Sequence, residues 1–226
     1  MQENIWEKEY KKPKLVTGHD KPQAFFVKFI KYLRKEKNIK SKGLNVLDLG
    51  SGTGRNTIYL AQNGAQVVGM EISDTAITLA QKRTRHLELD IKYLKQSIGS
   101  TYPFGDNEFD LIIDVTSSNS LDEKEREVYL DEVHRVLKKD GIFFVRALCK
   151  DGDKNAKFLL KNNPGEEKDT YIMPGTELQE RVFSEEDFRE TYSKYFNILK
   201  LEKTESYSKV GGRVYKRRFW LAVMGK

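Results

Sequence analysis

The sequence has few cysteines and histidines, and this scarcity excludes several classes of site. Cys149 is the single cysteine, so the chain has neither an internal disulfide nor a cysteine-rich zinc site. The histidines His19, His86 and His134 lack the spacing of metal ligands, and we expect no metal. With 226 residues, the chain is long enough to bury a stable core without disulfides or metal.

Long apolar runs are absent as well. No stretch approaches the roughly 18 apolar residues of a transmembrane helix, and residues 1–14 contain no apolar segment of the signal-peptide kind. The composition is nonetheless that of a folded domain, with 38% hydrophobic and 11% aromatic residues. We therefore expect a soluble, cytoplasmic protein.

Positive charge is concentrated at the two ends of the chain. Residues 1–42 hold 12 Lys and Arg against 5 Asp and Glu, and residues 200–226 hold 8 against 2. Such ends either form solvated surface, the interpretation we favour, or bind an anionic partner such as a nucleic acid or an acidic metabolite. The oligomeric state is not predicted.

Apolar segments with two periodicities alternate along the first two thirds of the chain. After a loose basic start, the pattern predicts helices over residues 22–37, 55–63, 74–87 and 123–138, and strands over residues 44–49, 66–71, 91–94, 109–115 and 142–148. Alternation of strands and helices is typical of a parallel sheet that is covered on both faces.

The pattern changes after the fifth strand. Residues 150–182 contain three glycines, two prolines and many charges, and are expected to form an excursion from the core. A helix over 184–195 and strands over 196–201 and 217–223 follow, and the short connection makes these two strands antiparallel. The predicted fold is α/β, with a doubly wound, seven-stranded, mostly parallel sheet and one antiparallel strand near its edge.

A glycine-rich turn follows the first predicted strand. Residues 46–55 read VLDLGSGTGR, and glycines in such a turn permit positive φ angles and let a ligand touch the backbone. The next helix offers unpaired N–H groups at its start. Glu71 ends the following strand, where a carboxylate can accept hydrogen bonds from both hydroxyls of a ribose. The sequence therefore predicts a nucleoside-containing cofactor across the strand ends.

The glycine pattern differs from the dinucleotide fingerprint G-x-G-x-x-G. The third glycine of that fingerprint would fall on Arg55 or Thr57, depending on the register. Asp48 beside the turn would repel a diphosphate and attract an ammonium group. S-Adenosylmethionine has a ribose, an ammonium group and a positive sulfonium but no phosphate, so the charge pattern favours it.

Four segments resemble the class I S-adenosylmethionine-dependent methyltransferases. They are VLDLGSGTGR, VVGMEIS, YPFGDNEFDLIID and EVHRVLKKDGIFFV, and they occur in the family's order within residues 44–148. The resemblance implies an enzyme with a Rossmann-like fold, in which residues 43–226 form the methyltransferase domain. Residues 1–42 would form a basic lid and helix segment packed on this core.

The resemblance also implies which residues bind the cofactor. They are Asp48, Gly50, Ser51, Gly52, Gly54, Glu71, Ile72, Gln96, Ser97, Ile98, Asp114 and Val115. Among them, Glu71 would hold the ribose and Asp48 would lie near the ammonium group. Asp114 and Val115 would face the sulfonium and the amino group, although Asp114 could instead cap the end of its strand.

Adenine recognition departs from the family pattern. Ile72 would pack on the adenine face, and residues 96–98 would border its edge. Many relatives have an aspartate at the position of Ile98, where it accepts a hydrogen bond from the adenine amino group. Recognition would then rest on backbone groups, or on Ser97 or Gln96.

The acceptor of the methyl group is harder to predict. Residues 115–121 lack the Asn/Asp-Pro-Pro-aromatic tetrapeptide of many enzymes that methylate nitrogens of nucleobases and glutamines. The candidate catalytic residues are Tyr10, His19 and Asn119. We expect Tyr10 and His19, together with Trp6, to help close the site.

Three functions remain open. The leading hypothesis is a methyltransferase for a small-molecule acceptor, which Tyr171, Met173 and Arg181 of the excursion would contact. The alternatives are a methyltransferase for RNA or protein that docks through its basic ends, and a non-catalytic S-adenosylmethionine-binding subunit that serves a partner.

Overall fold

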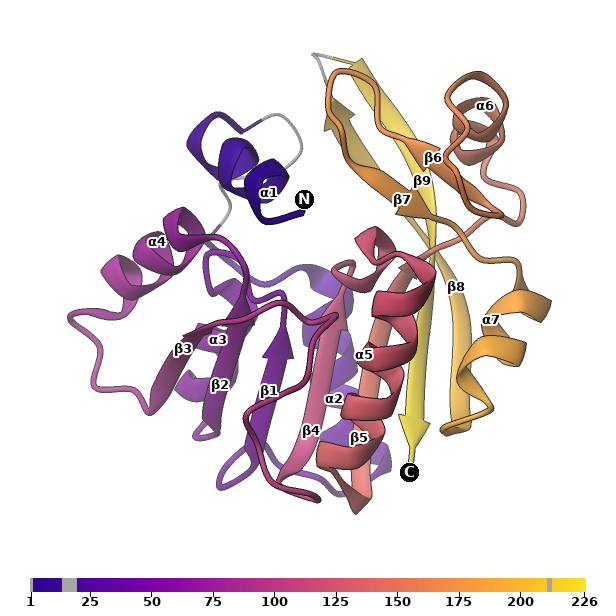
Figure 1. The fold of residues 1–226 in the computed structure, drawn as a ribbon. Coiled ribbons are helices and arrows are strands. Elements are labelled where there is room, and N and C mark those ends of the chain that lie inside the picture. Colours follow the sequence, from indigo (N-terminus) through magenta and orange to yellow (C-terminus); the bar gives the residue numbers. More distant parts are fainter. Residues whose placement is uncertain (1, 14–19, 211–212) are drawn as a thin grey trace.

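A seven-stranded sheet forms the centre of the computed structural model, which describes residues 2–13, 20–210 and 213–226 (Figure 1). The strands of this sheet are β1 (Asn45–Leu49), β2 (Gln66–Glu71), β3 (Ile91–Lys95), β4 (Phe109–Val115), β5 (Leu137–Leu148), β8 (Asn197–Val210) and β9 (Arg213–Gly225). The helices are α1 (Gln2–Lys11), α2 (Ala24–Glu36), α3 (Arg55–Gln62), α4 (Asp74–Thr84), α5 (Glu123–Val136), α6 (Lys154–Asn162) and α7 (Glu185–Tyr192).

The strand order is β3-β2-β1-β4-β5-β9-β8. The pairs among β1 to β5 are parallel, whereas β9 pairs in antiparallel fashion with both β5 and β8. This confirms the predicted mostly parallel sheet with a reversed strand next to its edge. The chain winds first toward β3 and then toward β8, so the order switches between β1 and β4. In open α/β sheets, ligands bind at the carboxyl ends of the strands at such a point.

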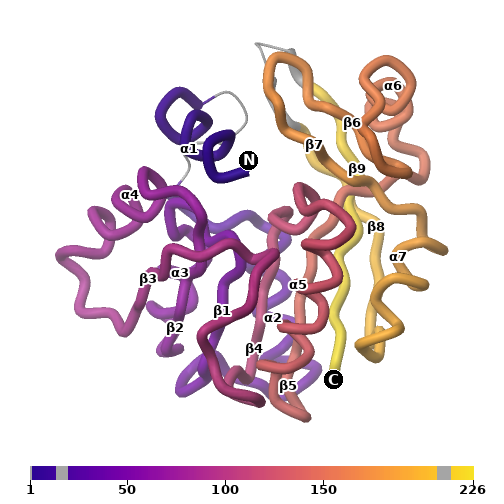
Figure 2. The backbone as a smooth tube through the Cα atoms, viewed as in Figure 1, coloured from indigo at the N-terminus to yellow at the C-terminus, as the bar shows by residue number. Residues whose placement is uncertain are grey.

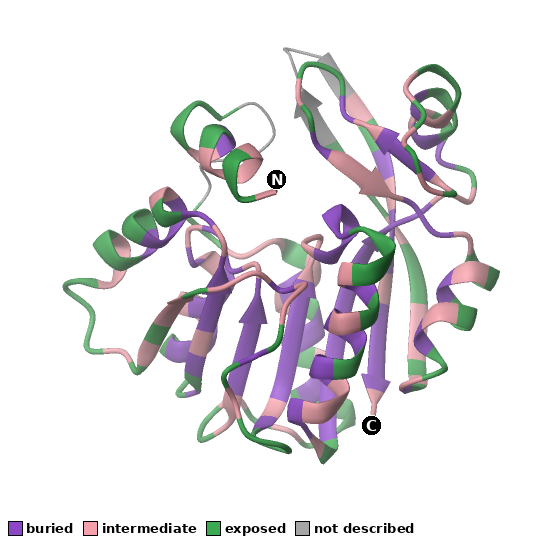
Figure 3. Cartoon of the chain, viewed as in Figure 1, coloured by how far each residue is buried: buried purple, intermediate pink, exposed green. Residues whose placement is uncertain are grey.

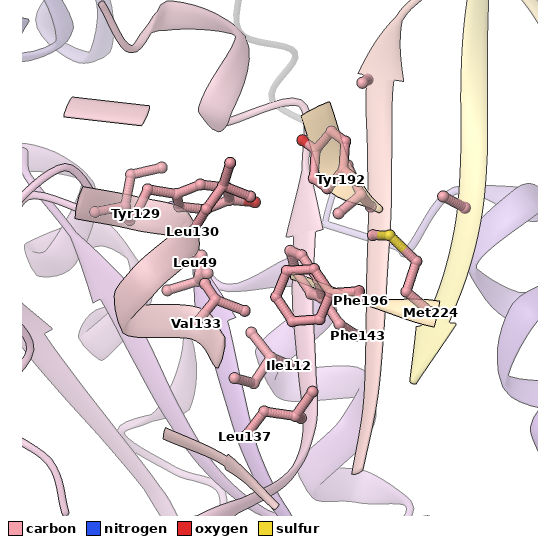
Figure 4. Packing of buried hydrophobic residues seen from close by; sticks show 14 of the residues in the cluster. Leu49, Ile112, Tyr129, Leu130, Val133, Leu137, Phe143, Tyr192, Phe196 and Met224 are labelled. Atoms are coloured by element: carbon pink, nitrogen blue, oxygen red, sulfur yellow. The ribbon is translucent and has the colours of Figure 1, made fainter. Parts of the chain in front are cut away.

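Helices cover both faces of the sheet, and apolar side chains fill the space beneath them. On one face, Phe26, Phe29 and Leu33 of α2 pack with α3 on a core of strand residues. On the other face, α5 and α7 cover a second core, part of which Figure 4 shows. The strands alternate between these two cores, and Figure 3 shows that most of the central strands are buried.

The excursion after β5 forms a small unit beyond the carboxyl end of the sheet (Figure 1). It contains α6 and an antiparallel pair, β6 (Thr170–Ile172) and β7 (Gln179–Arg181). Tyr171, Met173 and Leu178 pack there with Leu148 and Phe219, which are contributed by β5 and β9. The excursion is therefore anchored to the central sheet.

Helix α1, strand β5 and the hairpin β8–β9 differ from the predictions. The first residues form helix α1 rather than a loose start. Strand β5 begins at Leu137 rather than at residue 142, because α5 ends at Val136 and passes directly into the strand. The hairpin β8–β9 continues to Val210 and Arg213, far beyond the predicted strands, because a polar ribbon extends it past the core. No helix in the described part of the chain combines the length and apolar character that a membrane crossing requires.

Candidate functional site

The glycine-rich turn joins β1 to α3 at the switch point of the sheet. Gly50, Gly52 and Gly54 have positive φ angles of 67°, 55° and 81°. The backbone N–H of Ser51 donates to the carbonyl of Met70 at 2.9 Å, which ties the turn to the end of β2. A Cβ added to Gly52 would lie 2.7 Å from the hydroxyl at the end of the Tyr10 side chain, which would have to shift. The positive φ angles explain why glycine occupies these three positions, and contact of a ligand with their backbone stays a prediction.

Glu71 lies at the end of β2 and is only 4% exposed. Its Oε2 accepts from the backbone N–H of Gly52 at 2.8 Å, and its Oε1 accepts from Ile72 and Ser73 at 2.8 and 2.9 Å. Burial raises the pKa of this carboxyl group. A carboxylate offers about four acceptor positions. Glu71 can therefore both fix the glycine-rich turn and accept from a ligand hydroxyl.

Asp48 lies beneath the turn and is 2% exposed. Its Oδ2 accepts from the Thr57 hydroxyl at 2.6 Å. Burial raises the pKa of Asp48 to about 7, and the nearby carboxylates of Asp114 and Glu71 add to this shift. Three buried acidic side chains thus lie at this end of the sheet, and the charge of Arg55 opposes the rise in the pKa of Asp48. Acidic groups favour a cationic ligand over a phosphate, and the residues therefore fit S-adenosylmethionine.

Asp114 is fully buried at the end of β4 and holds the loop that follows. Its carboxylate accepts from the N–H of Ser117 at 2.8 Å, the N–H of Ser118 at 3.2 Å and the Tyr129 hydroxyl at 2.7 Å. This is the strand-end cap that the sequence left open as the alternative. The predicted contact with the sulfonium and the amino group would therefore come from the backbone of Asp114 and Val115.

The residues predicted to border the adenine have contacts of their own. The Gln96 side chain donates to Ser100 at 2.7 Å and to the carbonyl of Thr101 at 3.0 Å. The Ser97 hydroxyl accepts from the N–H of Gly99 at 3.2 Å, and Ile98 packs in the core beneath α5. An adenine contact here stays a prediction, and at Ile98 it would involve the backbone.

Helix α1 crosses the carboxyl ends of the strands, between α4 and the excursion (Figure 2). Glu7 accepts from the Ser73 hydroxyl at 2.6 Å and from the N–H of Thr75 at 3.1 Å, at the start of α4. Gln2 donates to the carbonyl of Ser120 at 2.6 Å. At its other side, Trp6 packs against the apolar cluster of the excursion. A lid function of this helix stays a prediction. Sequence reasoning missed Glu7 because its partners are distant in sequence.

The structure describes two of the three candidate catalytic residues, Tyr10 and Asn119. Tyr10 lies over Gly52, and burial followed by the charge of Glu71 raises its pKa. Asn119 is 1% exposed, its Oδ1 accepts from the N–H of Leu148 at 3.0 Å, and its buried Nδ2 has no hydrogen-bond partner among the described residues. His19 lies outside the described residues.

Tyr171, Met173 and Arg181, which the sequence suggests as contacts of the methyl acceptor, each have other partners within the protein. Tyr171 donates to Glu180 at 2.7 Å and accepts from Arg217 at 2.8 Å, within the buried interior. Met173 belongs to the apolar cluster of the excursion. Arg181 forms an ion pair with Asp187 of α7 at 2.9 Å, so its guanidinium is held at α7.

Arg146 is a residue that sequence reasoning missed. It interrupts the buried run IFFVRAL of β5 and is only 5% exposed. Arginine is almost never fully buried unless it is paired. A charge inside a strand that is otherwise apolar was therefore the signal that could have identified it.

Replacing Asp48 by asparagine should stabilise the ligand-free protein at pH 8. Since the pKa of Asp48 rises from 3.8 to about 7 on folding, the wild type loses stability as the pH rises through this interval. Asparagine keeps an acceptor for Thr57 and carries no charge. The free energies of unfolding should therefore diverge between about pH 4 and 7, by roughly 2–4 kcal/mol at pH 8. A difference that stayed constant across this range in urea titrations would contradict the assignment.

Comparisons with known proteins agree with this geometry. Residues 47–145 match the family model described as a methyltransferase domain. An uncharacterized methyltransferase of Synechocystis is 37% identical over 103 residues, which cover 46% of each protein, so the chain spans about half the length of this relative.

Two solved structures share the fold. A SAM-dependent methyltransferase from Methanosarcina mazei has a TM-score of 0.74 and 23% identity, covering 84% of this chain and 95% of that one. The 1,6-didemethyltoxoflavin-N1-methyltransferase of Burkholderia thailandensis, with bound 1,6-didemethyltoxoflavin and S-adenosylhomocysteine, has a TM-score of 0.69 and 16% identity, covering 100% and 87%. The matched domain, the sheet topology, the glycine-rich turn and the carboxylate at the end of β2 together support a class I S-adenosylmethionine-dependent methyltransferase.

Proposed function

We propose that this protein transfers a methyl group from S-adenosylmethionine to a small-molecule acceptor held at the carboxyl ends of β4 and β5. The observation that carries this proposal is the position of α1. The helix bridges the start of α4, the loop after β4 and the excursion, through Glu7, Gln2 and Trp6. An acceptor must therefore fit beneath this cover, which favours a small molecule over a macromolecule.

Bound S-adenosylmethionine supplies an activated methyl group. The chain has to bind it, align the acceptor and exclude water. In the proposed arrangement, Glu71 holds the ribose and the backbone of residues 50–54 supports the methionine portion. The negative charge of Asp48 and Glu71 stabilises the positive end of the cofactor. Tyr10 covers the turn and limits access of water from the side of α1.

A cavity of about 470 Å³ lies between α1 and the turn at residues 175–178, with Ile5 and Trp6 in its lining. None of its lining residues belongs to β4, β5 or the glycine-rich turn, so this cavity is separate from the proposed acceptor position. A structure of the same fold, the Burkholderia methyltransferase, binds the small molecule 1,6-didemethyltoxoflavin beside S-adenosylhomocysteine, which is consistent with a small acceptor.

Two alternatives have distinct signatures. A methyltransferase for RNA that docked through its basic ends would lose activity steeply between low and moderate salt, since counterion release governs such binding. A non-catalytic subunit would bind S-adenosylhomocysteine and still fail to produce it with any acceptor.

The proposal is tested with the purified chain in two steps. Calorimetry with S-adenosylhomocysteine measures cofactor binding, and a saturable one-site titration is expected. Formation of S-adenosylhomocysteine from S-adenosylmethionine is then measured with a panel of small hydroxyl, amine, thiol and carboxylate compounds, and with total RNA. Failure to bind the cofactor product, or turnover with RNA alone, would contradict the proposal.

A further inference from the structure

A buried cation lies at the end of β5, outside the cofactor contacts described above. The Arg146 guanidinium donates to the Ser206 hydroxyl at 3.1 Å and has a long contact with Thr116 Oγ1 at 3.4 Å. The Phe219 ring centroid lies 3.3 Å from its central carbon, and the Phe25 centroid lies 4.7 Å from it. The Nε of Arg146 has no hydrogen-bond partner among the described residues.

No carboxylate in the described part of the chain forms an ion pair with Arg146. Two other arginines are close enough to act on it instead. Burial, followed by the charges of Arg55 and Arg217, lowers the pKa of Arg146 to about 9, so the group stays charged at neutral pH. Arg217 itself forms an ion pair with Asp153, with 3.4 Å between its Nε and Oδ2 of Asp153. A buried cation without a counter-ion is costly, and an anionic ligand would offset that cost.

The position of Arg146 assigns it to the acceptor side of the site. In the sheet it is paired with Val115, and its carbonyl accepts from the N–H of Thr116 at 2.9 Å. Thr116 has a φ of 66°, which is strained for a β-branched residue and is a feature of functional loops. Asp48 and Glu71 lie instead at the glycine-rich turn, and the Asp114 carboxylate is held by the loop after β4 and by Tyr129. Arg146 thus places a buried positive charge on the acceptor side, near the end of β5.

We infer that the acceptor is an anion, and that Arg146 binds its carboxylate or phosphate group while Arg55 and Arg217 add to the attraction. A guanidinium that stacks on aromatic rings keeps its in-plane N–H groups for oxygen acceptors. The free Nε–H of Arg146 is such a group, and the weakly held Nη1–H is a second. This inference rests on the proposed function, because it names the chemical class of the acceptor.

The test uses matched pairs of probes on protein loaded with S-adenosylhomocysteine. Benzoate is compared with benzamide for the carboxylate, and phenyl phosphate with phenol for the phosphate. At least one anion should bind roughly 10- to 100-fold more tightly than its neutral partner, as expected for charge-assisted hydrogen bonds. Binding of benzoate would indicate a carboxylate acceptor, and binding of phenyl phosphate would indicate a phosphate acceptor. Equal binding within both pairs, or no binding of either anion, would overturn the inference without any variant.

Variants then identify the residue. Arg146→Gln should abolish the preference for the anion, and Arg146→Lys should retain part of it, because lysine keeps the charge but not the planar donor pair. Arg189→Gln removes an equal charge from the exposed surface of α7 and should leave the preference intact.

Cofactor affinity separates this inference from the proposed function. S-Adenosylhomocysteine should bind Arg146→Gln as it binds the wild type. If its affinity fell in parallel with that of the anion, Arg146 would belong to the cofactor carboxylate and the inference would be wrong. If the wild type bound no S-adenosylhomocysteine, the proposed function would fail, whereas the probe pairs would still report on the arginine cluster in the free protein.

Discussion

Replacing Glu71 by alanine should weaken the binding of S-adenosylhomocysteine about 100-fold or more, because hydrogen bonds to a buried charged group are strong. The loss has two sources. The ribose hydroxyls lose their acceptor, and the backbone N–H groups of Gly52, Ile72 and Ser73 lose theirs. The variant therefore removes a ligand contact and also loosens the glycine-rich turn. Calorimetry of the variant and the wild type measures the change.

Two further variants make this result specific. Glu71→Gln preserves the volume of the side chain but places an amide donor against backbone donors, so it should weaken binding as well. Glu88→Gln changes an exposed carboxylate in the loop before β3 and should bind normally. Thermal melts report whether each variant is folded. Wild-type affinity in a folded Glu71→Ala protein would refute the assignment of the ribose-binding carboxylate.

Removing residues 1–20 should reduce turnover about 100-fold or more while the sheet stays folded, since small displacements of reacting groups carry costs of this size. The deletion takes away Tyr10, which covers Gly52, and Glu7, which holds α1 to α4. It also exposes the apolar surface on which Trp6 packs. Water would then reach the reacting groups, and the acceptor would lose one wall of its site.

Single substitutions test whether turnover depends on the contacts that hold α1 against the start of α4. Glu7→Gln should lower turnover in part, because the amide can replace only some of the hydrogen bonds to Ser73 and Thr75. Lys8→Gln is the matched control on the same helix. Its ion pair with Glu177 is long, at 3.8 Å, and both side chains are exposed, so turnover should not change. Undiminished turnover of the truncated chain, with an unchanged melting temperature, would mean that α1 is no lid.

The central sheet was predictable because its strands are continuous apolar runs between clear helix boundaries. Periodicity alone located β1, β2 and β4 and the helices between them. Helix α1 was missed for a physical reason. Its sequence QENIWEKEYK has no broad apolar face, and its stability comes from contacts with α4, the loop after β4 and the excursion. Tertiary contacts of this kind have no local signature.

The cofactor side and the acceptor side of the site also differ in how far they could be predicted from the sequence. Residues 48–54 and Glu71 follow from local signals, since glycine spacing and the end of an apolar strand are readable in one dimension. The group of Arg55, Arg146 and Arg217 is not, because these residues come from α3, β5 and β9 and act on the pKa of Arg146 only in the folded chain. The carboxylate of Asp114 is a similar case, because its cap depends on Tyr129 of α5.

The reversed direction of β9 has a practical consequence for handling the protein. This strand brings Lys226 back to the amino-terminal edge of the sheet, where its Nζ donates to the carbonyl of Leu137 at 2.9 Å (Figure 1). Gln2, by contrast, contacts Ser120 next to the site. A fluorophore placed at Lys226 would therefore report from the edge of the sheet opposite the site, whereas one placed at Gln2 would lie beside the loop after β4.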